Sequence, residues 1–267
     1  MKILIIGAKG MLGSNLCLMY SKDKKNTIYA TGVSKPSFDF CENYKLDITN
    51  EKDFKIITEL NPDLVINCAA IVNVDFCENN FEITKNINSI GPKNLAKYCK
   101  EIGAYFVHIS SDAVFDGEKE GKYLETDITN PISQYGLSKL ESEKYIEEIG
   151  GKYIIIRTTI YGWNMKDKFS LSEWMLNELE NNSKFSGISD VYFTPILVNN
   201  LGRVIIELYN KEYTGIINIA GSEVCSKLEF AYKIAEIFSL NKSLISSASL
   251  NDMKFIAKRS KNMALDI

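Results

Sequence analysis

Tyr135 and Lys139 stand four positions apart in the segment QYGLSKLESEKY, residues 134–145. On a helix, this spacing puts both side chains on one face. A phenol is a poor acid–base catalyst at neutral pH because its pKa is about 10, and a neighbouring ammonium lowers that pKa by stabilising the phenolate. The pair therefore predicts a tyrosine that exchanges a proton with a substrate. The alternative is a chance pair on an ordinary helix surface.

A second group of polar side chains follows a segment that reads as a buried strand. In HISSDAVFDG, residues 108–117, this places Ser110, Ser111 and Asp112 at the carboxyl edge of a sheet. Ligands bind at that edge in open α/β folds. A serine hydroxyl there can hydrogen-bond a substrate carbonyl oxygen, and the alternative is a serine that only caps a turn.

Three glycines follow the first apolar segment of the chain, at Gly7, Gly10 and Gly13. Glycine permits a turn with positive φ and lets main-chain amides approach a pyrophosphate. The helix that starts here offers unpaired N–H groups and a partial positive charge, and Gly13 would let that helix pack closely on the strand. The pattern predicts a dinucleotide site, against the alternative of an ordinary strand-to-helix loop.

The end of the second predicted strand indicates which dinucleotide would bind. NAD sites usually carry an Asp or Glu there for the ribose 2′-hydroxyl, but residues 31–35 read TGVSK and contain no carboxylate. Lys9, Ser34 and Lys35 could instead meet a 2′-phosphate. We therefore expect NADPH as the cofactor, with NADH as the alternative. Both lysines would be solvated surface charges if this interpretation is wrong.

The elements that must position these residues alternate between apolar strands and segments of helical period. We expect strands at 2–8, 27–33, the end of 43–49, 63–70, 104–111 and 152–159, and helices at 11–22, 51–60, 81–102 and 133–149. Such alternation favours an α/β fold, a Rossmann-type doubly wound parallel sheet covered by helices on both faces.

After residue 160 the regular alternation of strands and helices ends, and we expect a smaller C-terminal α/β substrate lobe. Its predicted elements are helices near 169–181, 198–210 and 226–239 and a short strand at 215–220. We assign residues 1–160 to a dinucleotide-binding Rossmann domain and 161–267 mainly to a substrate-binding lobe, with a soft boundary because the parts interleave. The amphipathic segment 169–182 fits core or dimer packing, so a homodimer stays open.

Composition narrows the class of protein. The 267 residues are 45% hydrophobic and 24% charged, which is typical of a soluble globular protein. A net charge of −3 shows no basic footprint for nucleic acid, and no apolar run approaches the length of a membrane span. The start MKILIIGAKG lacks the form of a secretory signal, so we expect a cytoplasmic protein. With His108 as the sole histidine and no CxxC pair among six cysteines, we expect no metal site.

The three signals occur in the order glycine loop, serine, then YxxxK, and in this order the chain resembles the extended short-chain dehydrogenase/reductase family. Within that family it is most similar to dTDP-4-dehydrorhamnose reductases and their sugar-nucleotide relatives. The likeness runs through NPDLVINCAAIVNVDFCE (61–78), NINSIGPKNLA (86–96), HISSDAVFDG (108–117), NPISQYGLSKLESE (130–143), RTTIYG (157–162), FTPILVNNLGRVI (193–205), INIAGSEVCSKLEFA (217–231) and RSKNMALD (259–266).

The resemblance implies a set of roles for individual residues. The pyrophosphate would lie on residues 7–13, the adenine near 47–48 and the nicotinamide-side ribose over 68–71, while Asn88 matches a helix asparagine of the family whose role there could be structural. The implied cofactor-binding residues are Gly7, Lys9, Gly10, Met11, Leu12, Gly13, Ser34, Lys35, Asp47, Ile48, Cys68, Ala69, Ala70, Ile71, Asn88, Tyr135 and Lys139. The implied catalytic triad is Ser111, Tyr135 and Lys139.

The activity implied is hydride transfer from NAD(P)H to the ketone of a nucleotide-linked 4-keto-6-deoxy sugar, as in dTDP-rhamnose and polysaccharide biosynthesis. Tyr135 would donate a proton and Ser111 would hold the oxygen, with Asp112 and Ile160 on the substrate side. Two departures from the family pattern bear on the sugar. Ala113 and Ile160 stand where aromatic residues are common.

Two further functions stay open at this point. One is a sugar-nucleotide epimerase that retains its cofactor, and the other is a non-catalytic dinucleotide-binding regulatory subunit. Sugar-nucleotide dehydratases carry an Asp-Glu pair where this chain has Asp112 and Ala113, which argues against dehydration. The resemblance also implies one further helix beyond Ile267.

Overall fold

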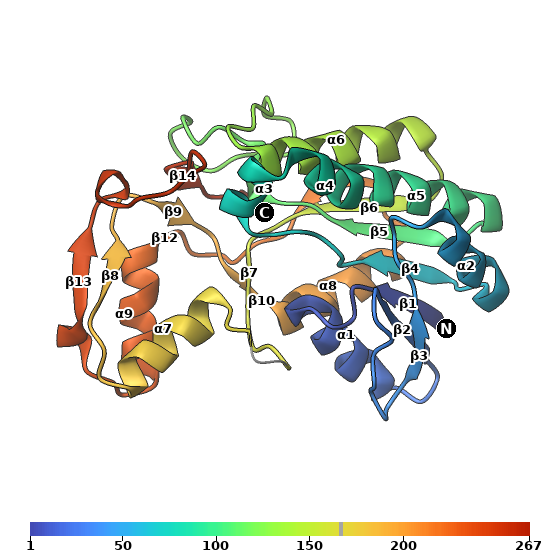
Figure 1. The fold of residues 1–267 in the computed structure, drawn as a ribbon, viewed down its shortest axis with the longest axis horizontal. Helices are drawn as coiled ribbons and strands as arrows, with labels where there is room; N and C mark the ends of the chain where they lie inside the picture. Colours follow the sequence, from blue (N-terminus) through green and yellow to red (C-terminus); the bar gives the residue numbers. More distant parts are fainter. Residues whose placement is uncertain (166–167) are drawn as a thin grey trace.

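A seven-stranded parallel sheet forms the centre of the protein (Figure 1). The computed structural model describes residues 1–165 and 168–267. The strands run in the order β11-β6-β5-β4-β1-β2-β3, and every neighbouring pair is parallel. They are β1 (Lys2–Ile6), β2 (Thr27–Gly32), β3 (Glu42–Lys45), β4 (Leu64–Asn67), β5 (Tyr105–Ile109), β6 (Tyr153–Arg157) and β11 (Gly215–Asn218). The order reverses between β1 and β4, which is where doubly wound sheets bind ligands.

Helices cover both faces of this sheet, as the alternation of elements predicts (Figure 1). Side chains alternate along β1, so Ile3 and Ile5 enter one core while Leu4 and Ile6 enter the other. The first core is closed by α1 (Met11–Ser21) and α8 (Val198–Asn210). The second is closed by the 3₁₀ helix Glu51–Phe54, α2 (Lys55–Leu60), α5 (Gly91–Ile102) and α6 (Gln134–Ile149). The predicted doubly wound α/β fold is confirmed.

The connection between β4 and β5 differs in detail from the expectation. The predicted helix 81–102 consists of α4 (Phe81–Lys85), a π-helical segment (Asn86–Ile90) and α5. A short helix, α3 (Val74–Asn79), precedes them and was not predicted. The third strand ends at Lys45, earlier than the expected end of 43–49.

A smaller part lies to one side of the sheet and packs around its own core (Figure 1). Its helices are α7 (Leu171–Glu180) and α9 (Lys227–Ile237), with 3₁₀ turns at Lys242–Leu244 and Leu250–Asp252. Its strands are β8 (Phe185–Ile188) paired with β13 (Ile245–Ala248), and β9 (Tyr192–Phe193) between β12 (Cys225–Ser226) and β14 (Asn262–Met263). A parallel pair, β7 (Ile160–Tyr161) and β10 (Ile196–Leu197), lies where the chain passes between the parts.

Two elements beyond residue 160 belong to the large sheet and not to the smaller lobe where the sequence suggested them. Strand β11 pairs with β6, in the register Gly215↔Ile154. Helix α8 packs on α1 so closely that a Cβ at Gly202 would lie 2.2 Å from the terminal methyl of Met19. Both elements bury apolar surface on the first core. The division into 1–160 and 161–267 stays a prediction, and the chain crosses that boundary more than once.

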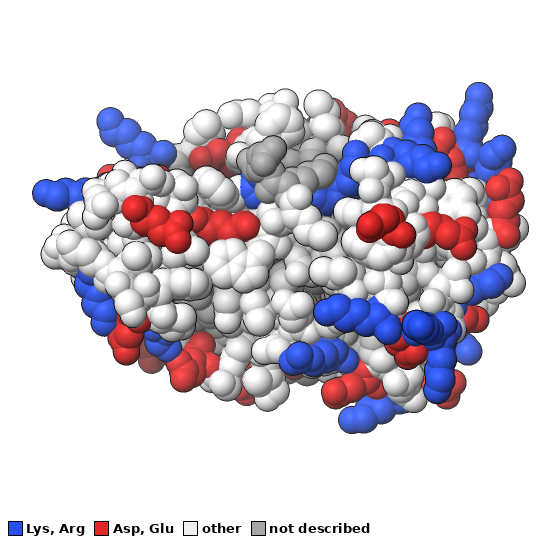
Figure 2. All heavy atoms as spheres, turned by 90° about the horizontal axis from the view of Figure 1, so that it is seen from below, with Lys and Arg blue, Asp and Glu red and all other residues white. Residues whose placement is uncertain are grey.

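On the face of the molecule drawn in Figure 2, acidic and basic side chains are interspersed. Of the helices in the described part of the chain, none has the length and apolarity to span a membrane. Within the same residues, no three His, Cys, Asp or Glu side chains are grouped as a metal site would need. The six cysteines are free thiols.

Candidate active site

The first turn of the site joins β1 to α1 through the predicted glycines. Gly7 has φ +76°, and a Cβ there would lie 2.7 Å from the amide nitrogen of Ala69. A Cβ at Gly13 would lie 2.4 Å from the carbonyl oxygen of Gly7. These two glycines are therefore required by the protein's own packing.

Gly10 differs from the other two, because a Cβ there would meet only the Gly7 carbonyl oxygen, at 3.4 Å. It is exposed and is the N-cap of α1, with no side chain capping the helix. The first bond of the helix runs from the Ser14 amide to the Gly10 carbonyl, so the amides of residues 11–13 precede the hydrogen-bonded part. This open, uncapped N-terminus fits a pyrophosphate, and the predicted residues Met11 and Leu12 lie on it.

The residues predicted to meet a 2′-phosphate come together at the end of β2. The Lys9 ammonium donates to the Ser34 hydroxyl at 2.5 Å, and Lys9 also lies over Gly32. Lys35 is exposed beside them. This corner joins two cations and one hydroxyl without a carboxylate from β2.

The structure places Asp47 and Ile48 past the end of β3, but neither side chain is free. Asp47 accepts from the amide of Thr49 at 2.9 Å and from its hydroxyl at 2.7 Å. Ile48 is buried in the second core, against Gly91. Any contact of Ile48 with an adenine would therefore use its main chain.

Residues 68–71 form the loop after β4, beside the glycine turn. Ala69 donates its amide to Asn67 at 3.1 Å, and Asn88 holds Ile71 through both its amide and its carbonyl, at 2.8 and 3.0 Å. Asn88 also donates to the Ser138 hydroxyl at 3.1 Å. Because its side chain is committed to these groups, Asn88 positions the loop on α6 and does not offer a free amide to a cofactor.

His108 supports the same region from inside the protein. Its ring nitrogens contact the Asn67 amide at 3.2 Å and the Ser142 hydroxyl at 3.0 Å. Burial lowers the pKa of His108 well below its usual value, with Lys139 acting in the same direction. His108 is therefore a neutral core residue and not a catalytic base.

The adjacent serines after β5 have different partners. Ser110 donates to the Glu143 carboxylate at 2.5 Å inside the protein. Ser111 donates to Asp112 at 2.8 Å and accepts from the Ala113 amide at 3.1 Å, as the N-cap of a 3₁₀ helix (Asp112–Val114). Ser111 thus caps a turn, and its hydroxyl also lies close enough to Tyr135 to lower the pKa of that phenol.

Tyr135 and Lys139 lie in the first two turns of α6, as the spacing predicts. The helix is capped by Ser133 and begins so close to the serine turn that a Cβ at Gly136 would lie 2.1 Å from the Ala113 carbonyl oxygen. Lys139 is 2% exposed and donates to the Ile109 carbonyl at 2.6 Å. Ser111, Tyr135 and Lys139 thus meet where β5 ends and α6 begins.

The pKa values of this pair correct one expectation. Burial, with smaller contributions from Asp112 and Cys77, raises the pKa of Tyr135 to about 12 against the opposing effect of Ser111. Burial lowers the pKa of Lys139 to about 8, opposed by Glu143. Lys139 is not among the groups that shift the pKa of Tyr135, and its ammonium is bound to the Ile109 carbonyl. The predicted lowering of the phenol's pKa by Lys139 is therefore not found in this structure.

An ion pair fixes the next turn of α6. Glu143 accepts from Arg157 on β6, with the closest contact at 2.7 Å and both side chains buried. Arg157 also donates to the Glu125 carbonyl at 3.1 Å and lies over the Phe115 ring, 5.2 Å from its centre. The pair ties α6 to the sheet directly below Lys139.

The predicted substrate residues Asp112 and Ile160 have different environments. Asp112 is buried and accepts from Ser111 and from the Thr159 hydroxyl. Burial raises the pKa of Asp112, and Lys227 is one of the groups that oppose this. Ile160 packs against the first core and pairs with Ile196, so its side chain is partly used in packing.

Sequence reasoning missed Thr159 and Lys227 as neighbours of Asp112. Both lie in quoted motifs, RTTIYG and INIAGSEVCSKLEFA, but neither received a role. The available signal was that both motifs are among the segments that carry the family resemblance. Their distance along the chain hides the contact.

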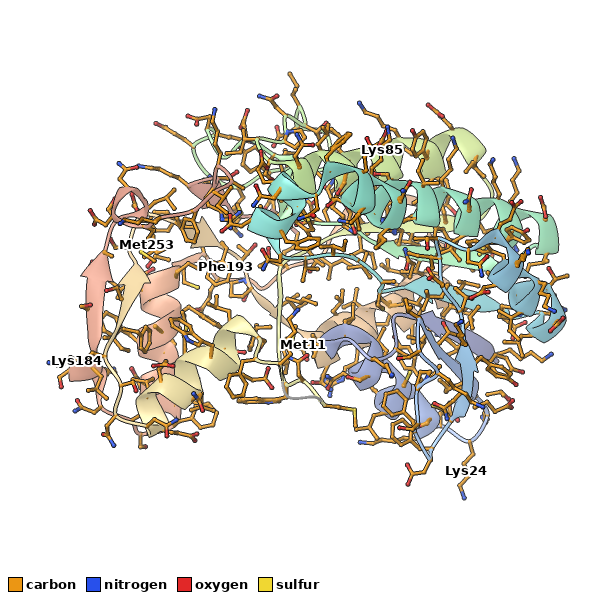
Figure 3. The ribbon with its side chains drawn as sticks, in the orientation of Figure 1. Met11, Lys24, Lys85, Lys184, Phe193 and Met253 are labelled. Carbon is orange, nitrogen blue, oxygen red and sulfur yellow. The ribbon has the colours of Figure 1, made fainter. Side chains whose placement is uncertain are left out.

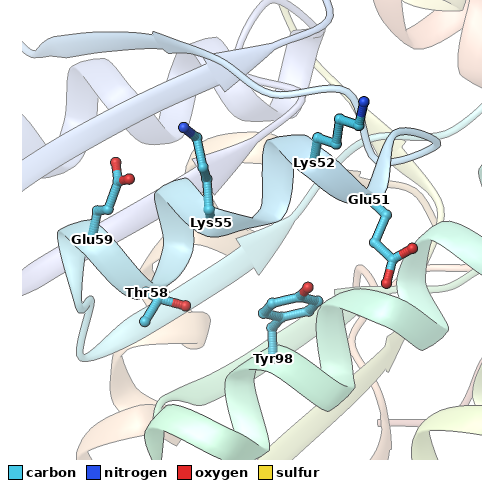
Figure 4. A pocket seen from close by; sticks show the side chains of 6 residues that line it. All are labelled: Glu51, Lys52, Lys55, Thr58, Glu59 and Tyr98. Atoms are coloured by element: carbon cyan, nitrogen blue, oxygen red, sulfur yellow. The ribbon is translucent and has the colours of Figure 1, made fainter.

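A surface hollow of about 610 Å³ lies away from these residues, between α2 with its preceding 3₁₀ turn and α5 (Figure 4). It is lined by Glu51, Lys52, Lys55, Thr58, Glu59 and Tyr98. None of the predicted site residues lines it, so it is not the candidate active site.

The fold and the site together define the class of short-chain dehydrogenases/reductases. The defining features are a doubly wound parallel sheet, a glycine turn before an uncapped helix, and a Ser–Tyr–Lys group at the carboxyl edge of the sheet. The family model described as the RmlD substrate binding domain matches residues 1–267, and the chain belongs to this family.

The chain is 31% identical over 267 residues to a probable low-salt glycan biosynthesis reductase of Haloferax volcanii, covering 98% of this chain and 89% of the relative. It is similar to the crystal structure of a dTDP-4-dehydrorhamnose reductase ortholog from Clostridium acetobutylicum, with a TM-score of 0.89, 34% identity and coverage of 100% and 90%. It is also similar to the dTDP-4-dehydrorhamnose reductase of Bacillus anthracis in complex with NADP, with a TM-score of 0.89, 28% identity and coverage of 99% and 90%.

Proposed function

We propose that this protein is an NAD(P)H-dependent reductase of a nucleotide-linked 4-keto-6-deoxy sugar, of the dTDP-4-dehydrorhamnose reductase type. The observation that carries the proposal is the meeting of Ser111, Tyr135 and Lys139 at the carboxyl edge of the sheet, next to the glycine turn. The family and the reductases that this chain resembles support it. NADPH is the cofactor we propose, with NADH as the alternative.

The residues that would hold the cofactor fit a dinucleotide. Gly10 and the free amides of residues 11–13 would take the pyrophosphate, and Lys9, Ser34 and Lys35 would take the 2′-phosphate. The main chain of residues 47–48 would contact the adenine, and residues 68–71 would contact the nicotinamide-side ribose. When bound, the reduced nicotinamide supplies a hydride to the sugar ketone.

Tyr135 is suited to donate the proton that accompanies the hydride. With a pKa of about 12, its phenol is protonated throughout the neutral range and can act as an acid towards a developing alkoxide. Ser111 is placed to hold the same oxygen once its hydroxyl turns from Asp112. Lys139 keeps a positive charge close to the site at neutral pH. Such pre-set donors act where charge develops, and each is worth about 10²–10³ in kcat.

The triad also bears on the alternatives. A regulatory subunit that only binds a dinucleotide has no need for a buried lysine beside a tyrosine, and burying an ammonium costs free energy. An epimerase that retains its cofactor would regenerate NADPH in each cycle. Net NADPH consumption therefore separates a reductase from both.

The test is NADPH oxidation by the purified protein with dTDP-4-keto-6-deoxy sugars, for the wild type and Tyr135→Phe. We expect turnover in the wild type and a loss of about 10²–10³ in kcat in the variant, which removes the proton donor. Cofactor binding, measured by the shift of Tm with NADPH, should persist in the variant. Near-wild-type turnover by Tyr135→Phe would falsify the mechanism, and no net NADPH oxidation with any such sugar would overturn the reductase.

A further inference from the structure

A lysine from the smaller part of the protein lies beside the catalytic edge of the sheet. Lys227 is the first residue of α9, directly after β12, and its amide donates to the Val191 carbonyl at 3.1 Å. Its ammonium lies 3.2 Å from the centre of the Phe193 ring on β9. In Figure 3, Phe193 lies on the side of the smaller part that is nearer the large sheet.

The segment after Phe193 is connected to Asp112 by hydrogen bonds through Thr159. Ile196 donates its amide to the Thr159 carbonyl at 2.9 Å, and the Thr159 hydroxyl donates to the Asp112 carboxylate. The charges of Lys227 and Asp112 act on each other. Asp112 raises the pKa of Lys227 against the effect of burial, which lowers it to about 8, and Lys227 lowers the pKa of Asp112.

Lys227 has unused hydrogen-bonding capacity. Within residues 1–165 and 168–267, its ammonium forms no hydrogen bond and no ion pair at contact distance, although it is half-buried. By contrast, the buried Lys139 is bound to a carbonyl and the buried Arg157 to a carboxylate. An ammonium carries three donors, and a carboxylate accepts about four hydrogen bonds, of which Asp112 receives one each from Ser111 and Thr159.

Burying a polar group costs free energy unless the group forms hydrogen bonds. The unused hydrogen-bonding capacity of Lys227 and Asp112 therefore favours a polar ligand at this place. Asp112 follows Ser111, the residue proposed to hold the reacting oxygen. A ligand group that reaches Asp112 therefore belongs to the part of the substrate next to the reacting carbonyl. A diphosphate would have no reason to approach a carboxylate, whereas a hydroxyl can donate to Asp112 and accept from Lys227.

We propose that Lys227 and Asp112 together hold the sugar hydroxyl on the carbon next to the ketone, which makes Lys227 a specificity-determining residue. This inference rests on the proposed function. The hydroxyl donates a hydrogen bond to the carboxylate and accepts one from the ammonium. Only a substrate with a hydroxyl at that position can therefore bond to both side chains. Lys227 acts on binding and orientation of the sugar, and the proton that enters the product comes from Tyr135.

The experiment compares wild type, Lys227→Met and Lys227→Arg with a dTDP-4-keto-6-deoxy sugar and with its analogue that lacks the neighbouring hydroxyl. A charge-assisted hydrogen bond contributes about 1.5–3 kcal/mol, so Lys227→Met should raise KM about 10–100-fold for the hydroxylated sugar. A smaller change in kcat is expected, since the contact is present in both ground and transition states. With the deoxy analogue, wild type and Lys227→Met should be alike, and Lys227→Arg should recover part of the discrimination.

The controls separate this inference from the proposed function. Lys233→Met, an exposed lysine on the same helix that pairs with Glu223, should match the wild type. Activity of the wild type with the hydroxylated sugar establishes the reductase independently of Lys227. With that activity present, an unchanged KM in Lys227→Met overturns the inference. An increase in KM of the same size for both sugars would also overturn it. So would a smaller Tm shift with dTDP alone in Lys227→Met than in the wild type, because either result would place Lys227 on the nucleotide.

Discussion

The Lys139 ammonium lies 2.6 Å from the carbonyl oxygen of Ile109, the last residue of β5. This contact joins α6 to the end of the strand that precedes Ser110 and Ser111. The same ammonium is not among the groups that shift the pKa of Tyr135. A buried cation with a single carbonyl partner is costly, and its cost should be visible in stability.

Lys139→Met should change the pH dependence of stability. Burial lowers the pKa of Lys139 from 10.5 to about 8, so the folded state binds the proton less tightly than the unfolded state. The penalty is complete below pH 8 and disappears as pH rises to about 10.5, where the unfolded lysine also loses its proton. Between pH 7 and 10.5 the wild type should therefore gain on the order of 3 kcal/mol relative to the variant. Urea unfolding at several pH values measures this, and a difference that does not vary with pH would show that only packing had changed.

The two serines after β5 should respond differently to substitution. Ser111→Ala removes the hydroxyl that acts on the Tyr135 phenol and should lower kcat about 10²–10³-fold, with a loss of stability of about 1 kcal/mol because the same hydroxyl caps the 3₁₀ turn. Ser110→Ala removes a donor to the buried Glu143 carboxylate, so we expect a loss of stability of about 1–3 kcal/mol with kcat largely kept. Steady-state kinetics and thermal unfolding of both variants test this, and an exchange of the two phenotypes would assign the catalytic role to Ser110.

That distinction was beyond the sequence, and it shows which parts of the site were predictable. The glycine turn, the serine turn and the start of α6 each depend on local sequence, and each was placed correctly by spacing and strand periodicity. The commitment of Ser110 to Glu143 depends on a residue 33 positions away. Likewise Lys227 and Asp112 act on each other's charge only because the chain returns from the smaller part. The pairing of β11 with β6 was not predictable for the same reason, since an apolar segment does not specify which sheet it joins.

Breaking the buried ion pair between Glu143 and Arg157 should destabilise the fold. Arg157→Met leaves the Glu143 carboxylate buried with Ser110 as its remaining side-chain donor. Removing one partner of such a pair costs about 3–5 kcal/mol. Arg203→Met, at an exposed site on α8, is the matched control and should unfold like the wild type. Equal unfolding free energies for the two variants would mean that water or another group replaces the arginine.

The glycines of the first turn should separate folding from cofactor binding. Gly13→Ala forces a Cβ to within 2.4 Å of the Gly7 carbonyl, so the variant should lose stability with or without cofactor. Gly10→Ala adds a methyl group that meets only the Gly7 carbonyl oxygen, at an ordinary contact distance of 3.4 Å, and should fold normally. It should nevertheless bind NADPH more weakly, because the methyl occupies the approach to the pyrophosphate. Tm without cofactor and Kd by titration distinguish the two, and normal NADPH binding by Gly10→Ala would move the pyrophosphate away from this turn.

Lys9 should set the preference between the two cofactors. Its ammonium is held by Ser34 at the end of β2, where an NAD site would carry a carboxylate. Lys9→Ala should lower kcat/KM for NADPH about 10–100-fold, since charge-assisted contacts to a phosphate contribute about 1.5–3 kcal/mol. The value for NADH should hardly change, because NADH carries a neutral 2′-hydroxyl at that position and no phosphate. Lys24→Ala, in the loop before β2 (Figure 3), is the matched surface control and should leave both values unchanged. If Lys9→Ala lowers kcat/KM equally for NADPH and NADH, the lysine contacts the pyrophosphate that both cofactors share. The preference must then come from another residue of the loop after β2.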